Sequence, residues 1–305
     1  MIMPNIPRER LVELKRFAGE IRKETVKEIS VFGTGHIGGS LSIADVLAVL
    51  YGEEMQVRVD DPRWEGRDWF ALSKGHCAPA LYATLALKGF FPKEWLATLN
   101  QNGTNLPSHA DRLKVPGVDI TAGSLGQGVS VAAGVAAAMK MNGKSNRVYA
   151  IVGDGESQEG QVWEMALFAA QQRLDNLTVF VDYNKLQLDG FCADICDMGD
   201  MAAKFASFGW YAQNLTDGND VEVILYAIER AKEQTDGKPN VIVLNTLKGL
   251  GWKDIEGQPK GHSTTISAEQ RDEAIGAADV FLEIITQPFL GSDGIVPDSS
   301  NRVIA

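Results

Sequence analysis

The chain has 305 residues, of which 45% are hydrophobic, and a formal net charge of −11. This length allows a full core, and we expect one domain over 1–290 followed by a loose, glycine- and serine-containing tail over 291–305. The acidic charge argues against nucleic acid or an anionic membrane as the main partner, because both bind basic surfaces. The chain shows no apolar signal core and no uninterrupted apolar run of about 18 residues, so we expect a cytoplasmic location.

The first half of the chain is predicted to be mainly helical. Apolar residues recur at the spacing of a helix face, and Ser40 or Ser42 is placed to cap the second helix. One short buried strand is expected over 68–72, and a loop over 117–128 precedes a helix whose small residues indicate close packing. The helices are predicted over 8–30, 42–51, 78–88 and 129–141.

The second half alternates strands with helices. Short apolar runs rich in β-branched residues predict three strands, with intervening helices over 162–172 and 220–235 and a last helix over 267–286. This alternation is typical of a doubly wound parallel α/β sheet with helices on both faces, in which ligands bind at the carboxyl ends of the strands. The strands are predicted over 147–152, 177–182 and 240–246.

Oxygen-bearing side chains follow two neighbouring strands of this sheet. A Gly-Asp-Gly turn at 153–155 stands where a strand ends and a helix begins, and Asn184 ends the next strand, thirty residues after Asp154. With one crossover helix between them, these strand ends are adjacent, so that a carboxylate, a carboxamide and a nearby carbonyl converge. Mg2+ prefers such oxygen ligands when it also holds phosphates, and the glycines and helix N–H groups suit the phosphate itself.

The histidines all fall in glycine-bearing or polar loop segments, and none lies in an amphipathic helix. Imidazole titrates near neutral pH and can donate, accept or bind anions. We therefore expect them to share one polar site, with four unrelated loop histidines as the alternative reading. They are His36, His76, His109 and His262.

The pattern from the Gly-Asp-Gly turn to Asn184 resembles the thiamine diphosphate fingerprint, and the surrounding sequence is similar to the N-terminal half of transketolase. The similarity runs through Leu-Ser-Lys-Gly-His at 72–76, Gly-Ser-Leu-Gly-Gln-Gly at 123–128 and the segment 186–190. The resemblance implies thiamine diphosphate with Mg2+, or Ca2+ or Mn2+ in its place. It also implies transfer of a two-carbon ketol unit from a ketose, a sugar phosphate, to an aldose.

The resemblance assigns the site residues to metal, cofactor and catalysis. The implied metal ligands are Asp154, Asn184 and the carbonyl of Leu186. The implied cofactor contacts are His76, the Gly155 N–H and His262 on the diphosphate, Glu156 beside them, Gly123 and Leu125 along the aminopyrimidine, and Leu188 against the thiazolium. The implied catalytic residues are His36 and His109 facing the sugar, His262, and Glu159 and Glu164 at a subunit interface. The alternative for these two glutamates is an ordinary place in the first turn of a helix.

The chain also departs from the family. Ile37 and Ser124 stand where proline is common, and the arginine and proline often found before His109 are absent, which leaves the substrate preference open. A complete transketolase continues into a pyrimidine-binding domain that carries the activating glutamate. The resemblance therefore implies one subunit of a two-gene enzyme, active only with a C-terminal partner subunit in a heterotetramer of two copies of each. A truncated chain or a regulatory paralogue is the alternative.

Three other functions stay open. Residues 33–38 fit the G-x-G-x-x-G fingerprint of an NAD-dependent dehydrogenase, although the segment before them is predicted to be helical and the Asp154 and Asn184 pair is left unexplained. The alpha subunit of a 2-oxo acid dehydrogenase shares the cofactor fingerprint but not the segments 72–76 and 123–128 in this arrangement. A non-catalytic interaction subunit is consistent with the absence of the activating glutamate.

Overall fold

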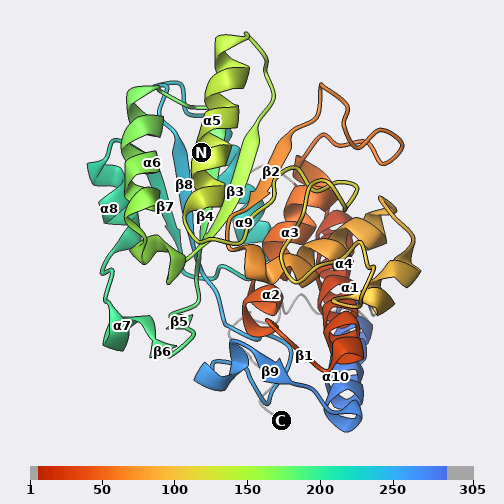
Figure 1. Ribbon diagram of the computed structural model, residues 1–305. Helices are drawn as coiled ribbons and strands as arrows, with labels where there is room; N and C mark the ends of the chain where they lie inside the picture. Colours follow the sequence, from red (N-terminus) through yellow and green to blue (C-terminus); the bar gives the residue numbers. More distant parts are fainter. Residues whose placement is uncertain (1–5, 287–305) are drawn as a thin grey trace, which may run out of the picture.

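A five-stranded parallel sheet with helices on both faces organises residues 6–286, the part of the chain that the computed structural model describes (Figure 1). The strands, in their order across the sheet, are β2 (Trp69–Leu72), β3 (Val148–Gly153), β4 (Leu177–Tyr183), β8 (Asn240–Asn245) and β7 (Tyr211–Leu215). This architecture confirms the predicted parallel α/β fold. The predicted tail over 291–305 lies outside the described residues.

The helices form two layers around the sheet. They are α1 (Arg8–Phe32), α2 (Gly38–Ser42), α3 (Ala44–Val49), α4 (Ala78–Lys88), α5 (Gln127–Met141), α6 (Gly160–Gln171), α7 (Cys192–Ile195), α8 (Met201–Ser207), α9 (Val221–Lys232) and α10 (Ala268–Thr286). Helices α5, α6 and α8 cover one face, while α9, α3, α4 and α1 lie on the other, with α10 packed along α1 (Figure 1). Within residues 6–286, no helix is long and apolar enough to span a membrane.

Side chains of each central strand alternate between two cores. On β3, Ala150 and Val152 pack into the core shared with α5 and α6, whereas Tyr149 and Ile151 join the core shared with α1, α3 and α4. Small side chains on the first face let the alanine-rich helix α5 approach the sheet closely, as its composition predicts. The sheet is thereby buried on both faces, and only its strand ends remain available to polar groups.

Helix α1 is continuous through the segment that a dehydrogenase would need as its first strand. It ends at Gly33, whose φ of +86° is a left-handed conformation that terminates helices. The G-x-G-x-x-G motif therefore follows a helix rather than a strand of the sheet. The NAD-dependent dehydrogenase alternative requires a strand of the sheet before this motif and is therefore wrong.

The helix predicted over 42–51 is broken and begins earlier. It consists of α2, α3 and a π-helical turn η1 (Leu50–Glu54). Neither predicted serine caps it, because Ser40 Oγ donates to the His36 carbonyl one turn back and Ser42 Oγ donates to Asp182. The bond of Ser40 stays within its own segment, whereas the early start at two glycines and the bond of Ser42 reflect tertiary packing, which overrides helix propensity here.

Further elements have weak sequence signals. The edge strand β7 is only partly buried and is not a β-branched run, so it escapes prediction. Other short elements also escape prediction. They are helices α7 and α8 and two small antiparallel pairs, β1 (Thr34–Gly35) with β9 (Thr264–Thr265) and β5 (Leu186–Gln187) with β6 (Gly190–Phe191). The pair of β1 with β9 brings the loops that carry His36 and His262 together.

Candidate functional site

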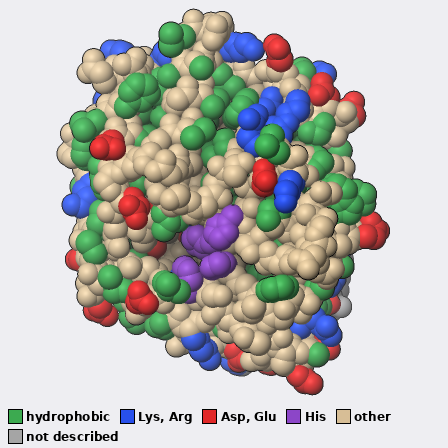
Figure 2. Space-filling view, viewed as in Figure 1, with side chains coloured by type: hydrophobic (Ala, Val, Ile, Leu, Met, Phe, Trp, Pro, Cys, Tyr) green, Lys and Arg blue, Asp and Glu red, His purple; other side chains and the backbone are tan. Residues whose placement is uncertain are grey.

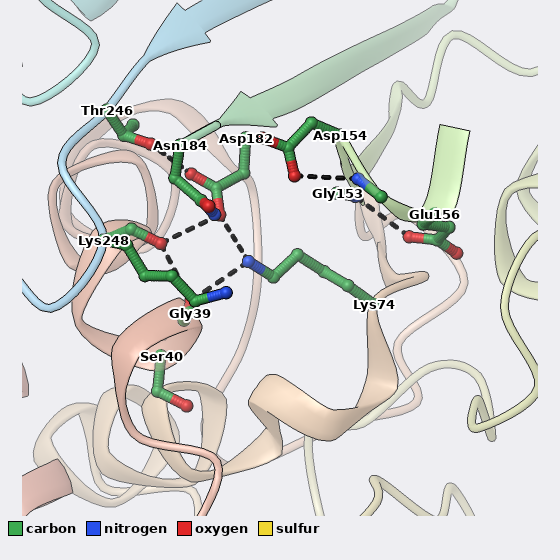
Figure 3. Close-up of polar contacts among 12 residues, drawn as sticks. Gly39, Ser40, Lys74, Gly153, Asp154, Glu156, Asp182, Asn184, Thr246 and Lys248 are labelled. Carbon is green, nitrogen blue, oxygen red and sulfur yellow. Dashed lines mark hydrogen bonds and ion pairs between the residues drawn. The ribbon is translucent and has the colours of Figure 1, made fainter. Parts of the chain in front are cut away.

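Strands β3 and β4 end side by side and present Asp154 and Asn184 to one cavity. Gly153 is in register with Asp182 in the parallel pair, and the two candidate ligands follow these residues. Both line a cavity of about 310 Å3 at the carboxyl edge of the sheet (Figure 3). This confirms the prediction that the two strand ends are adjacent.

Asp154 is a buried carboxylate held by backbone N–H groups. Gly155 N–H donates to its Oδ1 at 2.8 Å and Lys185 N–H to its Oδ2 at 2.5 Å. Lys185 reaches it with a φ of +69°, a conformation that costs a non-glycine residue about 1–2 kcal/mol. Burial, and then the neighbouring Asp182, raise the pKa of Asp154 to about 6. A bound cation would favour the charged form of such a carboxylate.

The other two candidate metal ligands lie beside it. Asn184 turns its Nδ2 toward Asp182 and accepts the Leu186 N–H at Oδ1, at 3.1 Å. The Leu186 carbonyl accepts from Lys248 Nζ at 2.7 Å. Among residues 6–286, no three His, Cys, Asp or Glu side chains gather as a metal-binding group. A metal at this edge would therefore use the amide and carbonyl oxygens with the carboxylate, a donor set that fits a hard divalent ion.

All four histidines meet at the same cavity, as predicted. The His36 ring lies 5.3 Å from His76, 5.9 Å from His109 and 5.6 Å from His262 between ring centroids, and His76 lies 5.2 Å from His262. They form one group in a hollow of the surface (Figure 2). The reading as four unrelated loop histidines is therefore wrong.

These imidazoles are held in the neutral state at pH 7. Burial, reinforced by Lys248, lowers the pKa of His262 to about 3. Burial followed by Lys74 brings the pKa of His76 well below its ordinary value, and burial lowers the pKa of His36 and His109 as well. A neutral imidazole can both donate and accept a hydrogen bond, so this cluster suits proton transfer and hydrogen bonding more than fixed positive charge.

Two glycines allow the histidine-bearing loops to approach. A Cβ on Gly38 would lie 2.3 Å from the Gly261 carbonyl oxygen, and one on Gly75 would lie 2.5 Å from the Ala122 carbonyl oxygen. The first contact places His36 beside His262, and the second places His76 beside the loop that begins at Gly123. The glycines are thus needed for close backbone approach rather than for flexibility.

The remaining predicted cofactor residues lie on the cavity wall, with one qualification for Glu156. Gly123, Leu125, Gly155 and Leu188 line the cavity together with Glu156. The Glu156 carboxylate, however, is already bound by the protein. Ser73 Oγ and Gly126 N–H donate to Oε1 at 2.6 and 2.9 Å, and Gly153 N–H donates to Oε2 at 3.0 Å. The geometry gives Glu156 the role of joining three loops of the site.

Glu159 and Glu164 do not line the cavity. Both are exposed at the start of α6, outside the group of residues around Asp154. Exposure fits a surface that a partner could cover, and their predicted role at a subunit interface stays a prediction.

Sequence reasoning left three polar residues of the site without a role. Lys74 is 2% exposed and ion-paired with Asp182 at 2.5 Å, and Lys248 is 2% exposed with its Nζ 3.1 Å from His262 Nδ1. A lysine inside the Ser-Lys-Gly-His segment, directly before a predicted site histidine, was the available signal for Lys74. Lys248 and Asp182 had only their place near a strand end.

A parallel α/β sheet with oxygen donors, neutral histidines and two buried lysines at its carboxyl edge is typical of α/β proteins that bind a ligand at the ends of their strands. Residues 14–277 match the family model described as "Transketolase, thiamine diphosphate binding domain". The chain belongs to this family.

Two relatives of similar length are named as transketolase subunits. The chain is 48% identical over 267 residues to the 6-deoxy-6-sulfo-D-fructose transketolase subunit of Clostridium sp. strain MSTE9, covering 88% of this chain and 96% of that one. It is 38% identical to an apulose-4-phosphate transketolase subunit of Phocaeicola vulgatus, covering 83% of this chain and 89% of that one.

Solved structures of longer transketolases share the fold. The crystal structure of the Pichia stipitis transketolase in complex with sedoheptulose 7-phosphate superposes with a TM-score of 0.81 at 28% identity. The match covers 90% of this chain but 44% of that one. The chain thus spans less than half the length of these transketolases.

Proposed function

We propose that this chain is the cofactor-binding subunit of a two-subunit transketolase that transfers a two-carbon ketol unit from a ketose to an aldose. The observation that carries the proposal is the meeting of Asp154, Asn184 and four histidines in one cavity of a chain from this family. Relatives that the chain covers almost end to end, and whose names describe them as transketolase subunits, support it.

The residues at the strand ends fit a diphosphate and its metal. Asp154, Asn184 and the Leu186 carbonyl would hold Mg2+, and the Gly155 N–H, His76 and His262 would bind the diphosphate. Lys248 is a further candidate, because its ammonium group lines the cavity beside His262. When bound, thiamine diphosphate supplies the carbon nucleophile and electron sink for cleaving and forming the carbon–carbon bond.

Two of the histidines that line the cavity would handle protons and hydroxyl groups of the sugar. His36 and His109 are less buried than His76, and their lowered pKa values keep them neutral at pH 7. A neutral imidazole in contact with a sugar hydroxyl can take up its proton and return it. Glu156 would act indirectly by fixing the loops that carry Gly126 and Gly153.

The partner would be a C-terminal transketolase subunit carrying the pyrimidine-binding domain, in a heterotetramer. Glu159 and Glu164 on the exposed start of α6 would face it. The substrate would be a ketose with a terminal anionic group, a phosphate as the family resemblance implies or a sulfonate as in the name of the 48% identical relative. An acidic chain would leave recognition of that group mainly to the partner.

The proposal is tested by mixing the chain with its candidate partner and measuring ketol transfer between a ketose phosphate and an aldose. We expect activity only with both chains, thiamine diphosphate and Mg2+. The Asp154→Ala variant should abolish Mg2+-dependent cofactor binding by the assembled enzyme. Cofactor binding without transfer would identify an interaction subunit, and decarboxylation of a 2-oxo acid would identify a dehydrogenase subunit. Unchanged cofactor affinity in the variant would disprove the metal assignment.

A further inference from the structure

Asp182 is the most heavily hydrogen-bonded side chain beneath the proposed cofactor site, although it does not line the cavity. It has no exposed surface and accepts from four side chains. Its Oδ2 accepts from Lys74 Nζ at 2.5 Å, Ser42 Oγ at 2.8 Å and Asn184 Nδ2 at 2.8 Å. Its Oδ1 accepts from Thr246 Oγ1 (Figure 3).

These donors come from separate segments that all carry parts of the site. Lys74 follows β2, Thr246 follows β8 and Ser42 ends α2, while Asp182 belongs to β4. Lys74 adds a second link, because its ammonium group also donates to the Gly39 carbonyl at 3.1 Å. One buried carboxylate therefore joins three strand ends and the helix that follows the His36 loop.

The bond from Asn184 fixes the orientation of a proposed metal ligand. The oxygen and nitrogen of a carboxamide lie on opposite sides of its carbon, so the choice of partner for one decides where the other points. Since Nδ2 is bound to the Asp182 carboxylate, an acceptor only, Oδ1 must face away from it. A second bond supports the same orientation, because the Leu186 N–H donates to Oδ1 at 3.1 Å. Without Asp182, the amide would lose the shorter of these two bonds, and its NH2 group could turn to where an oxygen is required.

Lys74 stabilises the charged carboxylate of Asp182 in the protein interior. An uncompensated carboxylate in the interior is strongly unfavourable, and a second one lies nearby in Asp154. The ammonium group of Lys74, itself 2% exposed, balances the charge of Asp182.

We propose that Asp182 is a positioning residue that orients the Asn184 carboxamide for the metal, with Lys74 as the charge that keeps Asp182 in place. This inference rests on the proposed function, because it takes Asn184 as a metal ligand. Groups that orient metal ligands without touching the metal typically contribute about 10–100-fold to metal affinity.

The test measures the apparent Mg2+ affinity of the assembled two-chain enzyme at a fixed thiamine diphosphate concentration, by tryptophan fluorescence. Asp182→Asn should weaken Mg2+ binding by about 10–100-fold, because an asparagine can turn its own NH2 group toward Asn184. The transfer rate at saturating Mg2+ should recover to within about threefold of the unmodified enzyme, since a positioning residue takes no part in the chemistry. Thr246→Val is the matched control. It removes one bond to the other carboxylate oxygen and should shift Mg2+ affinity by less than about threefold.

Two further variants keep the outcomes separate. If Asp182→Asn fails to fold, Asp182→Asn is combined with Lys74→Met, so that both buried charges are removed together. This double variant should still show the weakened Mg2+ affinity. Asn184→Ala tests the metal site itself, and unchanged Mg2+ affinity there would overturn the metal assignment on which this inference rests. Weakened binding in Asn184→Ala with normal binding in Asp182→Asn would overturn only the positioning role. Equal losses in Thr246→Val and Asp182→Asn would also overturn it, because they would point to a general structural effect.

Discussion

Replacing Glu156 by glutamine tests whether one buried carboxylate holds the loops of the site together. Glutamine keeps the shape but offers one acceptor oxygen. If that oxygen serves Ser73 and Gly126, its NH2 group faces the Gly153 N–H, and an unsatisfied buried donor costs about 1–3 kcal/mol. The two surviving bonds also lose the strength that an ionised acceptor gives.

An opposing effect limits the loss. Burial raises the pKa of Glu156, so the ionised carboxylate costs stability above its pKa, and glutamine removes that cost. This gain and the weakening of the two surviving bonds act in opposite directions, so we expect the net loss to stay near the penalty of the unsatisfied donor. That is about 1–3 kcal/mol in the free energy of unfolding, measured by urea denaturation. Cofactor affinity, measured by calorimetry on the assembled enzyme, should fall with it, because Gly153 precedes Asp154.

The neighbouring Glu159 provides the control. It is exposed and lies three residues further on, just before α6, so Glu159→Gln should change the free energy of unfolding of this chain by less than about 0.5 kcal/mol. A Glu156→Gln variant as stable as the unmodified chain, with unchanged cofactor affinity, would refute the reasoning.

The histidines and one glycine of the site give three more predictions. His36→Ala and His109→Ala should leave cofactor affinity intact and slow transfer by roughly 10²–10⁴-fold in steady-state assays. Loss of cofactor binding with normal turnover of the remaining holoenzyme would instead make these histidines cofactor-binding residues. Because burial and Lys248 lower the pKa of His262 to about 3, the unfolded chain binds a proton between a pH of about 6.5 and about 3 that the folded chain does not bind. The free energy of unfolding should therefore decrease as the pH is lowered through this window. Urea denaturation at several pH values should show a smaller decrease in His262→Ala. Gly38→Ala should destabilise the chain by about 1–3 kcal/mol, because its Cβ meets the Gly261 carbonyl. The control is Gly134→Ala, in open space on α5, which should stabilise the chain slightly. Equal shifts of the thermal unfolding midpoint in the two variants would contradict the close approach at Gly38.

Strong periodic signals made most of the fold predictable. The central strands and helix α4 fall within about two residues of the predicted bounds, because buried strands must be apolar throughout and helix ends carry glycine or proline signals. The break in α2 and α3 and the edge strand β7 were missed. Their conformations depend on contacts with distant segments, such as Ser42 with Asp182, which local propensity does not encode.

The residues of the site also fall into those that the sequence could predict and those that it could not. Asp154 and Asn184 could be placed together because strands joined by one crossover helix are usually neighbours in a parallel sheet, as β3 and β4 are. The place of Lys248 could not be predicted, since its bond to the Leu186 carbonyl depends on how the loop after β8 folds toward β5. Local sequence patterns likewise do not indicate that both oxygens of Glu156 are occupied by Ser73, Gly126 and Gly153.

A chain with a net charge of −11 can still suit an anionic cofactor because the charge at the cavity is local. The histidines contribute little positive charge, since burial keeps them neutral. Lys74 is balanced by Asp182, so that among the described residues lining the cavity Lys248 is the cation left to act on a diphosphate, together with the proposed metal on Asp154. Affinity for the diphosphate should therefore depend on the metal and Lys248, while the histidines remain free for hydrogen bonds and proton transfer.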